Sequence, residues 1–484
     1  MKSMKAVWRI GLSILALSLL VAWSVGSTSL ISNIAQAQNG QSSSSLKVFS
    51  EDQAQQAQAD WATDWSKKLG LSLLASFDSS GPAAWDAKAH PVVFITTEGP
   101  GYAGQLSKTN TKPGIAIIDA VTRQVVASQQ YELEGVKPSD YFEPHGLGVS
   151  GDGRWIYLPT GTSAGFGEIG SGRLLIIDAK TLKLSKVLST PTNAHHAEAF
   201  TNAQGKSLVL AYGFSSGNYY VLDPKDDNKV VGGILNNDLQ GNGYLGFVDL
   251  SGKYMLASVR PPTGLVDAPG FVAVVDTQTW KVVRNVSVRD SSPIWVSFTA
   301  DGKNAYVSGG HESLVIKLNI EGAPSRWSVV GMSRAGVEGP YGINLNWDET
   351  QIWTHGKGEG SHNLGITMGL TNPKLMVDST RAIQAVGEYY TACLRNDHGA
   401  VHPDPKLNEL WLSCNSSFEV VVFDMAKKEV KARIPLPNGG STHSGSFVRY
   451  TVDDQGNWTG EVQSDQNGLQ GSALAEKKKI LGIK

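Results

Sequence analysis

Four of the ten histidines stand at corresponding places in a repeated sequence pattern. They are His145 in PHGLGVSGDG, His196 in NAHHAEAF, His398 in NDHGAVHPD and His443 in THSGSF, and each begins a short apolar run that leads into a polar turn. A single histidine at such a place more often makes hydrogen bonds than binds a ligand. Several imidazoles that meet in space, however, form a site for copper, zinc, iron or nickel.

Two further histidines stand after the second apolar run of their units. His311 lies in SGGHES and His355 lies in IWTHGKGEGSH, in two units that have no histidine at the first place. Because antiparallel neighbours run in opposite directions, the end of a second strand returns to the face where the first strand begins. We therefore expect six imidazoles on one face, and the six metal ligands would be His145, His196, His311, His355, His398 and His443.

The number of imidazoles bears on the metal. Histidine ligands without a thiolate favour copper among redox metals, and six exceed the three or four that a single zinc ion uses, so more than one ion is expected. His195 adjoins His196, and the alternation of side chains along a strand predicts that it points to the opposite face. His90 and His402 are expected to be structural.

Charged residues near the same face offer groups for proton transfer and anion binding. Glu98 follows the run VVFITT, Lys112 stands in the next loop, and Arg260 ends the run ASVR. A carboxylate there would take up a proton, and a cationic side chain would hold a small anion. For each of the three, a surface or structural charge is the plainer alternative.

The elements that must position these residues follow from a sevenfold repeat. Turn signals recur about every 50 residues, from GDG at 151–153 to DQG at 454–456. A strand such as WIYLPTG follows the turn, a third strand often ends in aspartate, as in LLIIDA, and a fourth strand is more polar. Four antiparallel strands per unit at this period predict an all-β fold, a seven-bladed β-propeller with four-stranded blades. In the sixth unit, GITMGL and LMVDST are alternatives for the third strand.

The two ends of the repeat complement each other. The last unit begins a first strand, GSFVRYTV, without a complete blade after it, whereas PVVFITTEG and GIAIIDA near the start are second and third strands without a first. A C-terminal strand that completes the N-terminal blade would close the ring and remove its exposed edges.

The chain divides into four segments. Lys2, Lys5 and Arg9 precede an apolar run, and an A-x-A site at 35–37 offers cleavage after Ala37, which predicts a signal peptide and export to the periplasm. An uncleaved membrane anchor is the alternative. No second apolar stretch of this length follows in the sequence, so no further membrane span is predicted. The expected segments are a signal peptide at 1–37, a polar linker with a short helix at 38–84, the propeller at 85–465 and a solvated tail at 466–484.

Composition excludes some functions. The net charge of −2 argues against a nucleic-acid partner. The two cysteines, Cys393 and Cys414, are able to pair in an oxidising compartment, although the sequence does not decide whether they do. No C-x-x-C-H motif is present, so no c-type haem is attached to the chain itself.

Together, the histidine motifs on an exported seven-bladed propeller resemble the thiocyanate dehydrogenases and, more distantly, the propeller of nitrous oxide reductase. The resemblance rests on EPHGLGVSGDG, NAHHAEAF, SGGHES, WTHGKGEGSH, NDHGAVHPD and THSGSF. It implies a periplasmic multicopper oxidoreductase with three copper ions, which oxidises thiocyanate to cyanate and sulfur. The six histidines would be ligands, Asp249 would supply the aspartate ligand of the family, and Glu98 and Lys112 would be its acid and its lysine.

The resemblance also implies partners. Electrons would pass to an external acceptor such as a c-type cytochrome, and a homodimer is an assembly that the sequence allows. In the implied reaction, copper activates a water that attacks the carbon of thiocyanate, while Lys112 or Arg260 holds the anion. The alternative from another class is a metal-free periplasmic propeller that serves as a binding or scaffold module, in which the histidines are incidental.

Overall fold

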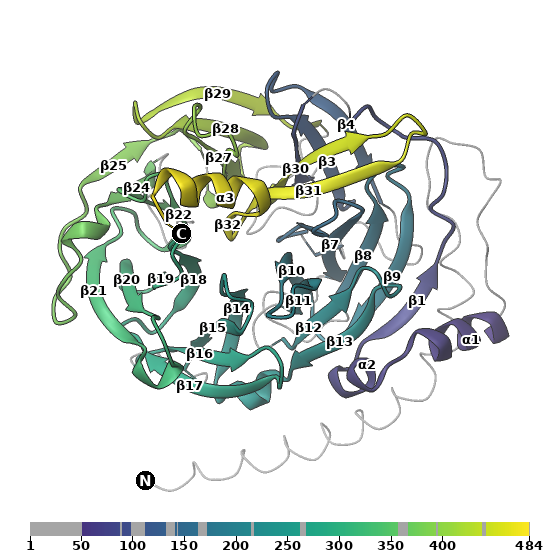
Figure 1. The fold of residues 1–484 in the computed structure, drawn as a ribbon, viewed down its shortest axis with the longest axis horizontal. Coiled ribbons are helices and arrows are strands. Elements are labelled where there is room, and N and C mark those ends of the chain that lie inside the picture. Colours follow the sequence, from purple (N-terminus) through teal and green to yellow (C-terminus); the bar gives the residue numbers. More distant parts are fainter. Residues whose placement is uncertain are drawn as a thin grey trace, which may run out of the picture.

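Seven antiparallel sheets stand around one central axis as the blades of a propeller (Figure 1). This confirms the fold predicted from the repeat. The computed structural model describes residues 51–87, 90–97, 112–131, 141–142, 144–162, 172–213, 217–261, 268–356, 366–393, 395–437 and 442–483. Within these residues, no helix is both long and apolar enough to cross a membrane.

Blades 3 to 7 each contain four strands in chain order, with the first strand innermost. Blade 3 contains β10 (Ala194–Thr201), β11 (Ser207–Gly213), β12 (Tyr219–Asp223) and β13 (Lys229–Ile234); blade 4 contains β14 (Asn242–Val248), β15 (Tyr254–Arg260), β16 (Phe271–Asp276) and β17 (Lys281–Ser287); blade 5 contains β18 (Pro293–Phe298), β19 (Asn304–Gly309), β20 (Leu314–Asn319) and β21 (Ser328–Arg334). Blade 6 contains β22 (Pro340–Leu345), β23 (Ile352–Gly356), β24 (Ile366–Thr371) and β25 (Gly387–Tyr390); blade 7 contains β26 (Asn396–Val401), β27 (Glu409–Cys414), β28 (Glu419–Asp424) and β29 (Glu429–Pro435). In blade 6 the third strand is therefore GITMGL, and a 3₁₀ turn at Pro373–Leu375 leads into the competing segment.

Blade 2 carries an additional outer strand from the N-terminal segment. Its strands are β5 (Tyr141–Phe142), β6 (Gly148–Val149), β7 (Trp155–Thr162), β8 (Gly172–Asp178) and β9 (Leu184–Thr190), and β1 (Ser72–Ser76) pairs with β9. Two helices, α1 (Glu51–Trp61) and α2 (Asp64–Leu69), precede β1 beside blades 2 and 3. Thr63 caps α2, and its hydroxyl donates to the carbonyl of Val230 in blade 3 at 2.7 Å. The segment before the ring is thus fastened to two blades.

Blade 1 is shared between the two ends of the chain, as expected. Its sheet runs in the order β32 (Gly468–Leu469), β31 (Trp458–Asp465), β30 (Gly445–Val452), β2 (Val92–Thr97), β3 (Gly114–Asp119) and β4 (Val125–Gln130). The inner strand β30 comes from the C-terminal part and pairs with β2 in the register Val92↔Val448 to Ile95↔Gly445. These backbone hydrogen bonds join distant parts of the sequence and close the ring without an exposed inner edge.

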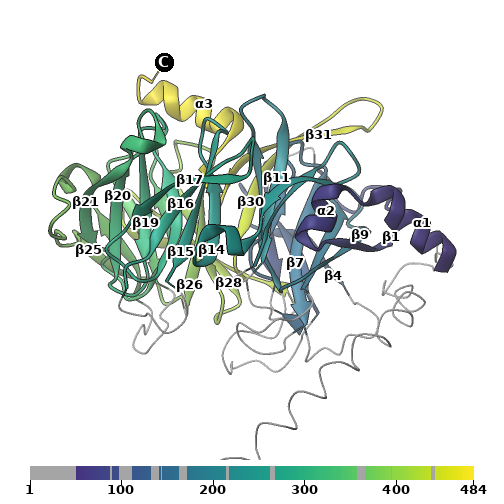
Figure 2. The same cartoon turned by 90° about the horizontal axis from the view of Figure 1, so that it is seen from below.

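The C-terminal segment is packed against the disc, which corrects the expectation of a solvated tail. After β31 (Trp458–Asp465) and β32 (Gly468–Leu469), helix α3 (Gly471–Ile480) lies across one face of the disc (Figure 2). Lys477 is buried, with its Nζ 3.0 Å from Glu349 Oε1 and 3.1 Å from the carbonyl oxygen of Asn346. The lysine run suggested a solvated terminus, but this ion pair and hydrogen bond offset the cost of burying one of its charges.

Candidate metal centre

Each first strand of blades 3 to 7 is irregular near the place where it begins. The pairing of the first and second strands shifts between Ala194 and His196, Gly243 and Gly246, Pro293 and Val296, Pro340 and Ile343, and Asn396 and Gly399. A β-bulge of this kind bends the strand and changes the direction of the side chains within it. The residues at these bulges include His195, Tyr244, Trp295, Tyr341 and His398. The mouth of the channel is therefore built from a backbone irregularity that recurs in five blades.

The bulge in blade 3 overturns the expectation for His195. Strict alternation would place its side chain on the opposite face from His196. Instead, the Nδ1 atoms of the two residues lie 2.9 Å apart, and the His195 ring stacks on that of His145 with 4.3 Å between centroids. The side chains of His195 and His196 are both fully buried. The register shift turns both imidazoles toward the same cluster.

Backbone hydrogen bonds tie together the histidine-bearing segments of blades 1, 2 and 3. The amide of Gly146 donates to the carbonyl of His195 at 2.7 Å, and the amide of Ala197 donates to the carbonyl of Gly146 at 2.8 Å. On the other side, the amide of Ser444 donates to the carbonyl of His145 at 3.3 Å. The three segments thus hold one another in register near the axis.

Three imidazoles from blades 2, 3 and 7 meet at this point. One ring nitrogen from each of His145, His196 and His398 lies within 4.8 Å of the other two, and all three side chains are buried. The Nε2 atoms of His196 and His398 are 2.8 Å apart, and the His145 ring is about 5 Å from each of the other two rings between centroids. Among the residues that the structure describes, this is the group of donors with metal-ligand geometry.

The chemistry of these donors fits a first-row transition metal ion. Two imidazole nitrogens bound to one tetrahedral ion would lie about 3.3 Å apart, given metal–nitrogen bonds of about 2.0 Å. The 2.8 Å between His196 and His398 is a hydrogen-bond distance, and it would widen by about 0.5 Å to hold an ion. A three-histidine set leaves a fourth position open, which is the arrangement of catalytic rather than structural zinc sites.

His443 packs on the three-histidine group without joining it. Its ring lies 3.8 Å from that of His145 and 5.7 Å from that of His398, between centroids. The Asn415 amide contacts His443 Nδ1 at 3.0 Å, and the His443 backbone amide donates to Thr96 Oγ1 at 2.9 Å. These contacts fix the ring beside the three donors, where it is able to accept a proton.

The other half of the mouth is aromatic. Tyr244, Trp295 and Tyr341 of blades 4, 5 and 6 are buried and stand at the same bulges of their first strands as the histidines of blades 3 and 7. The Tyr341 hydroxyl lies 3.3 Å from His145 Nε2 and 3.2 Å from the Tyr244 hydroxyl, and the Trp295 ring lies 5.2 Å from that of His398. These residues limit the approach of water and orient the His145 ring.

Two glycines make room for imidazole rings of the neighbouring blades. A Cβ atom on Gly146 would stand 1.9 Å from His196 Cδ2, and one on Gly399 would stand 2.3 Å from His355 Cε1. Both glycines directly follow a histidine of the cluster, in the dipeptides His145-Gly146 and His398-Gly399. The His-Gly dipeptide is thus a signal in the sequence for a histidine of this centre.

A disulfide supports the blade 7 side of the centre. Cys393 and Cys414, both fully buried, are bonded to each other. Cys393 lies five positions before His398, and Cys414 directly precedes Asn415, the partner of His443. The bond therefore links the segments that carry two groups of the site.

Two predicted ligands lie elsewhere. The side chain of His311 is 60% exposed and pairs with Glu312 at 3.1 Å, because it stands beyond the end of β19 rather than within a strand. Asp249 accepts from the amides of Lys253 and Tyr254 in the turn after β14, at the opposite end of that strand from Tyr244. Neither reaches the cluster. His355 is buried beside Gly399 but is not in the group of three donors.

The structure describes four of the five other residues that the sequence analysis singled out, and Glu98 is the exception. Glu98 lies outside the described residues. Lys112 is half-buried, in the residues just before β3. Arg260 stacks on Tyr244 with its Cζ 3.9 Å from the ring centroid. His90 is hydrogen-bonded to Asp119 at 2.6 Å, and His402 Nε2 lies 3.3 Å from the carbonyl oxygen of Ala120, so both have structural contacts as expected.

The C-terminal segment fills the channel from the side of the turns. Glu198 follows His196 by two positions on β10, and Gln466 Nε2 donates to its carboxylate at 3.1 Å. Burial, together with the nearby carboxyl of Asp465, raises the pKa of Glu198 well above its usual value. Burial likewise raises the pKa of Asp465 to about 7. The residues after β31 thus lie on the turn side of the histidine cluster.

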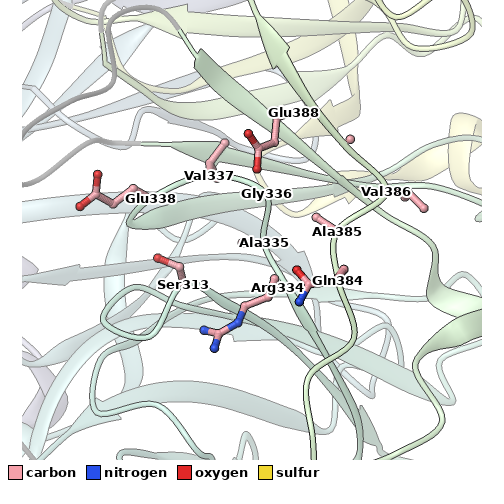
Figure 3. A pocket seen from close by; sticks show the side chains of 11 residues that line it. Ser313, Arg334, Ala335, Gly336, Val337, Glu338, Gln384, Ala385, Val386 and Glu388 are labelled. Atoms are coloured by element: carbon pink, nitrogen blue, oxygen red, sulfur yellow. The ribbon is translucent and has the colours of Figure 1, made fainter.

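A separate hollow lies at the rim of the disc between blades 5 and 6 (Figure 3). Its cavity volume is about 720 Å³, and its polar lining includes Arg334, Glu338, Gln384 and Glu388. None of the clustered histidines lines it. The channel mouth is therefore the better candidate for a catalytic site.

Comparisons with known proteins bear on the fold. No protein family profile and no curated protein matches the sequence. A solved structure from Bacteroides uniformis, provisionally assigned as a 6-phosphogluconolactonase, is 16% identical with a TM-score of 0.52 and covers 74% of this chain and 100% of its own. The periplasmic gluconolactonase PpgL of Pseudomonas aeruginosa is 15% identical with a TM-score of 0.50, over 73% of this chain and 99% of its own. At these identities the likeness shows the propeller fold.

These comparisons correct the function predicted from the motifs. The similar propellers carry lactonase names, and lactonases are hydrolases, so the resemblance to thiocyanate dehydrogenase and the prediction of a copper oxidoreductase were wrong. The alternative prediction, a non-catalytic scaffold, is not supported either, because the similar propellers have the names of enzymes. The physical reason is that every propeller brings the starts of its inner strands to one face, so short histidine motifs there do not specify one family.

Proposed function

We propose that this protein is a metal-dependent hydrolase whose single transition-metal ion is held by His145, His196 and His398. The observation that carries the proposal is the meeting of three buried imidazole donors within 4.8 Å, from three different blades, at the mouth of the channel. A shared ion would join the three imidazoles, which are donors that first-row transition metals accept. Copper and zinc both suit this donor set.

When bound, an ion of this kind supplies Lewis acidity, which polarises a carbonyl and makes water a stronger acid. The protein's own groups do the rest. Tyr341 orients the His145 ring through the 3.3 Å contact with Nε2. His443, held by Asn415 and packed against the His145 ring, is the group placed to accept a proton. Trp295 and Tyr244 limit the water around the reacting group.

A lactone or related ester is the substrate class proposed here. Ring opening of a lactone by water needs an activated water next to the lactone carbonyl, and a base that takes the proton of the water. An ion held by the three histidines would activate the water, and His443 would be the base. The names of the two similar propellers point the same way, although their likeness concerns the fold. Glucono-1,5-lactone is therefore the first substrate to test.

The decisive experiment combines metal analysis with a hydrolysis assay. Protein produced with copper or with zinc in the medium is purified, and the bound metal is counted per chain. One ion per chain, lost after chelation together with glucono-1,5-lactone hydrolysis and restored by adding it back, supports the proposal. Protein that binds no stoichiometric metal, or that hydrolyses the lactone equally well after chelation, contradicts it. Three copper ions per chain would instead match the number that the motif resemblance implied.

The site of action is a further part of the proposal. The basic residues, apolar run and A-x-A site within residues 1–37 are the features of a signal peptide. We propose export to the periplasm with cleavage after Ala37. N-terminal sequencing of the protein recovered from a periplasmic extract tests this, and a mature chain beginning at Met1 would refute it.

A further inference from the structure

We propose that Arg260 and Tyr244 form a binding site for the carboxylate group of the substrate at the mouth of the channel. This inference rests on the proposed metal centre for the chemistry but stands on its own for binding. Blade 4 brings no histidine to the mouth. It contributes Tyr244 from the bulge of β14 and Arg260 from the end of β15, which its register pairs with Asn242 at the start of β14.

The guanidinium is held by an aromatic ring rather than by an acid. Its Cζ lies 3.9 Å from the centroid of the buried Tyr244 ring, which is a cation–π contact. Among the described residues no carboxylate forms an ion pair with Arg260, whereas Arg123 is paired with Glu409 at 2.7 Å. Arg260 Nε is buried and makes no hydrogen bond in the described part of the chain. Within the described part of the chain, the positive charge is therefore fixed in place and no carboxylate neutralises it.

A stacked guanidinium is suited to a planar anion. Stacking covers the flat face of the group and leaves its N–H donors directed outward in the plane, where two of them match the two oxygens of a carboxylate. Because Arg260 is half-buried, it is partly shielded from water, which strengthens such a contact. A neutral ligand would leave the charge uncompensated.

The position of Arg260 relates this contact to the proposed reaction. Tyr244 lies 5.5 Å from the His195 ring between centroids, so the guanidinium is within about 10 Å of the histidine cluster. The Tyr244 hydroxyl also contacts that of Tyr341, which contacts the ligand His145. A small substrate whose carboxylate sits on Arg260 would place a carbonyl several bonds away near the three histidines. The favoured substrates are thus lactones or esters that carry a carboxylate.

The test uses a charged probe and an uncharged one of the same shape. Binding of ¹³C-labelled acetate and of acetamide to the full-length mature protein is followed by NMR line broadening, with and without chelator. We expect acetate to bind and acetamide to bind at least tenfold more weakly. Arg260→Gln should weaken acetate binding at least tenfold, and Arg260→Lys, which keeps the charge but loses the planar fork, should give an intermediate loss.

Arg154→Gln is the matched control, because Arg154 also stacks on an aromatic ring, that of Trp155 at 4.6 Å, but lies in a turn at the opposite end of its blade. It should leave acetate binding unchanged, and circular dichroism should show all variants folded. Acetate binding that Arg260→Gln does not alter, or equal binding of acetamide, would overturn the inference. If Arg260-dependent acetate binding persists in protein that never binds metal, the carboxylate site stands and the metal-dependent hydrolase proposal fails.

Discussion

The Nε2 atoms of His196 and His398 lie 2.8 Å apart although 202 positions separate the two residues in the sequence. One stands on the inner strand of blade 3 and the other on that of blade 7. Buried nitrogens this close share either one proton or one metal ion, since two charged rings at this distance would repel each other. The predictions below follow from this pair and from the groups that position it.

Removing one donor should abolish tight metal binding. We expect His398→Ala to weaken the affinity by more than about 100-fold, since loss of an outer-shell partner alone costs 10–100-fold. His311→Ala is the control, because that side chain is exposed and distant from the cluster. Chelator competition measures both affinities. A similar loss in the two variants would show that the three-histidine group is not the site.

A methyl group at Gly146 should disturb the centre without removing a donor. Its Cβ would stand 1.9 Å from His196 Cδ2, so the ring has to move, at a cost in the free energy of unfolding of about 1–3 kcal/mol. We expect Gly146→Ala to lower metal affinity at least tenfold. In Gly151→Ala, at the turn of the same blade, the new Cβ meets the Ser207 hydroxyl instead, and metal affinity should be unchanged.

Loss of the disulfide should affect both stability and the site. The bond spans a sequence separation of 21, and a loop of this length corresponds to about 3 kcal/mol in the free energy of unfolding. The double variant Cys393→Ser/Cys414→Ser should therefore unfold at a lower denaturant concentration. Because the bond lies next to Asn415, metal affinity should fall as well. An unchanged denaturation midpoint in the oxidised wild type and the double variant would argue against the pairing.

Asp465 should make the protein less stable as the pH rises. Its pKa is about 7 when folded and about 3.9 when unfolded, so the folded state binds the extra proton between these values. The stabilising contribution of this group is complete below about pH 4 and is lost as the pH rises to 7. Between these two values the free energy of unfolding falls by about 1.4 kcal/mol per pH unit. Asp465→Asn should flatten this slope in urea titrations from pH 5 to 8. An equally steep slope in the variant would assign the pH dependence to other groups.

The sequence by itself determined the architecture of this protein. Turn signals at a constant period and apolar runs of strand length specify seven blades, because each blade buries its faces only against its neighbours. The incomplete first and last units specified ring closure through β30 and β2. The repeat also aligned His145, His196, His398 and His443 with one another, since equivalent places in a ring lie at equivalent heights.

Only the tertiary structure decided which side chains meet. The bulge that turns His195 toward His145 depends on the register of β10 against β11, which no local pattern specifies. His311 is exposed because it stands beyond the end of its strand, and a spacing argument treats such a residue like one within it. The closure of the channel by the segment around Asp465 and Gln466 arises from contacts between distant parts of the chain. The periodic pattern encodes strands and their order, whereas the direction of each side chain depends on pairing across strands and blades.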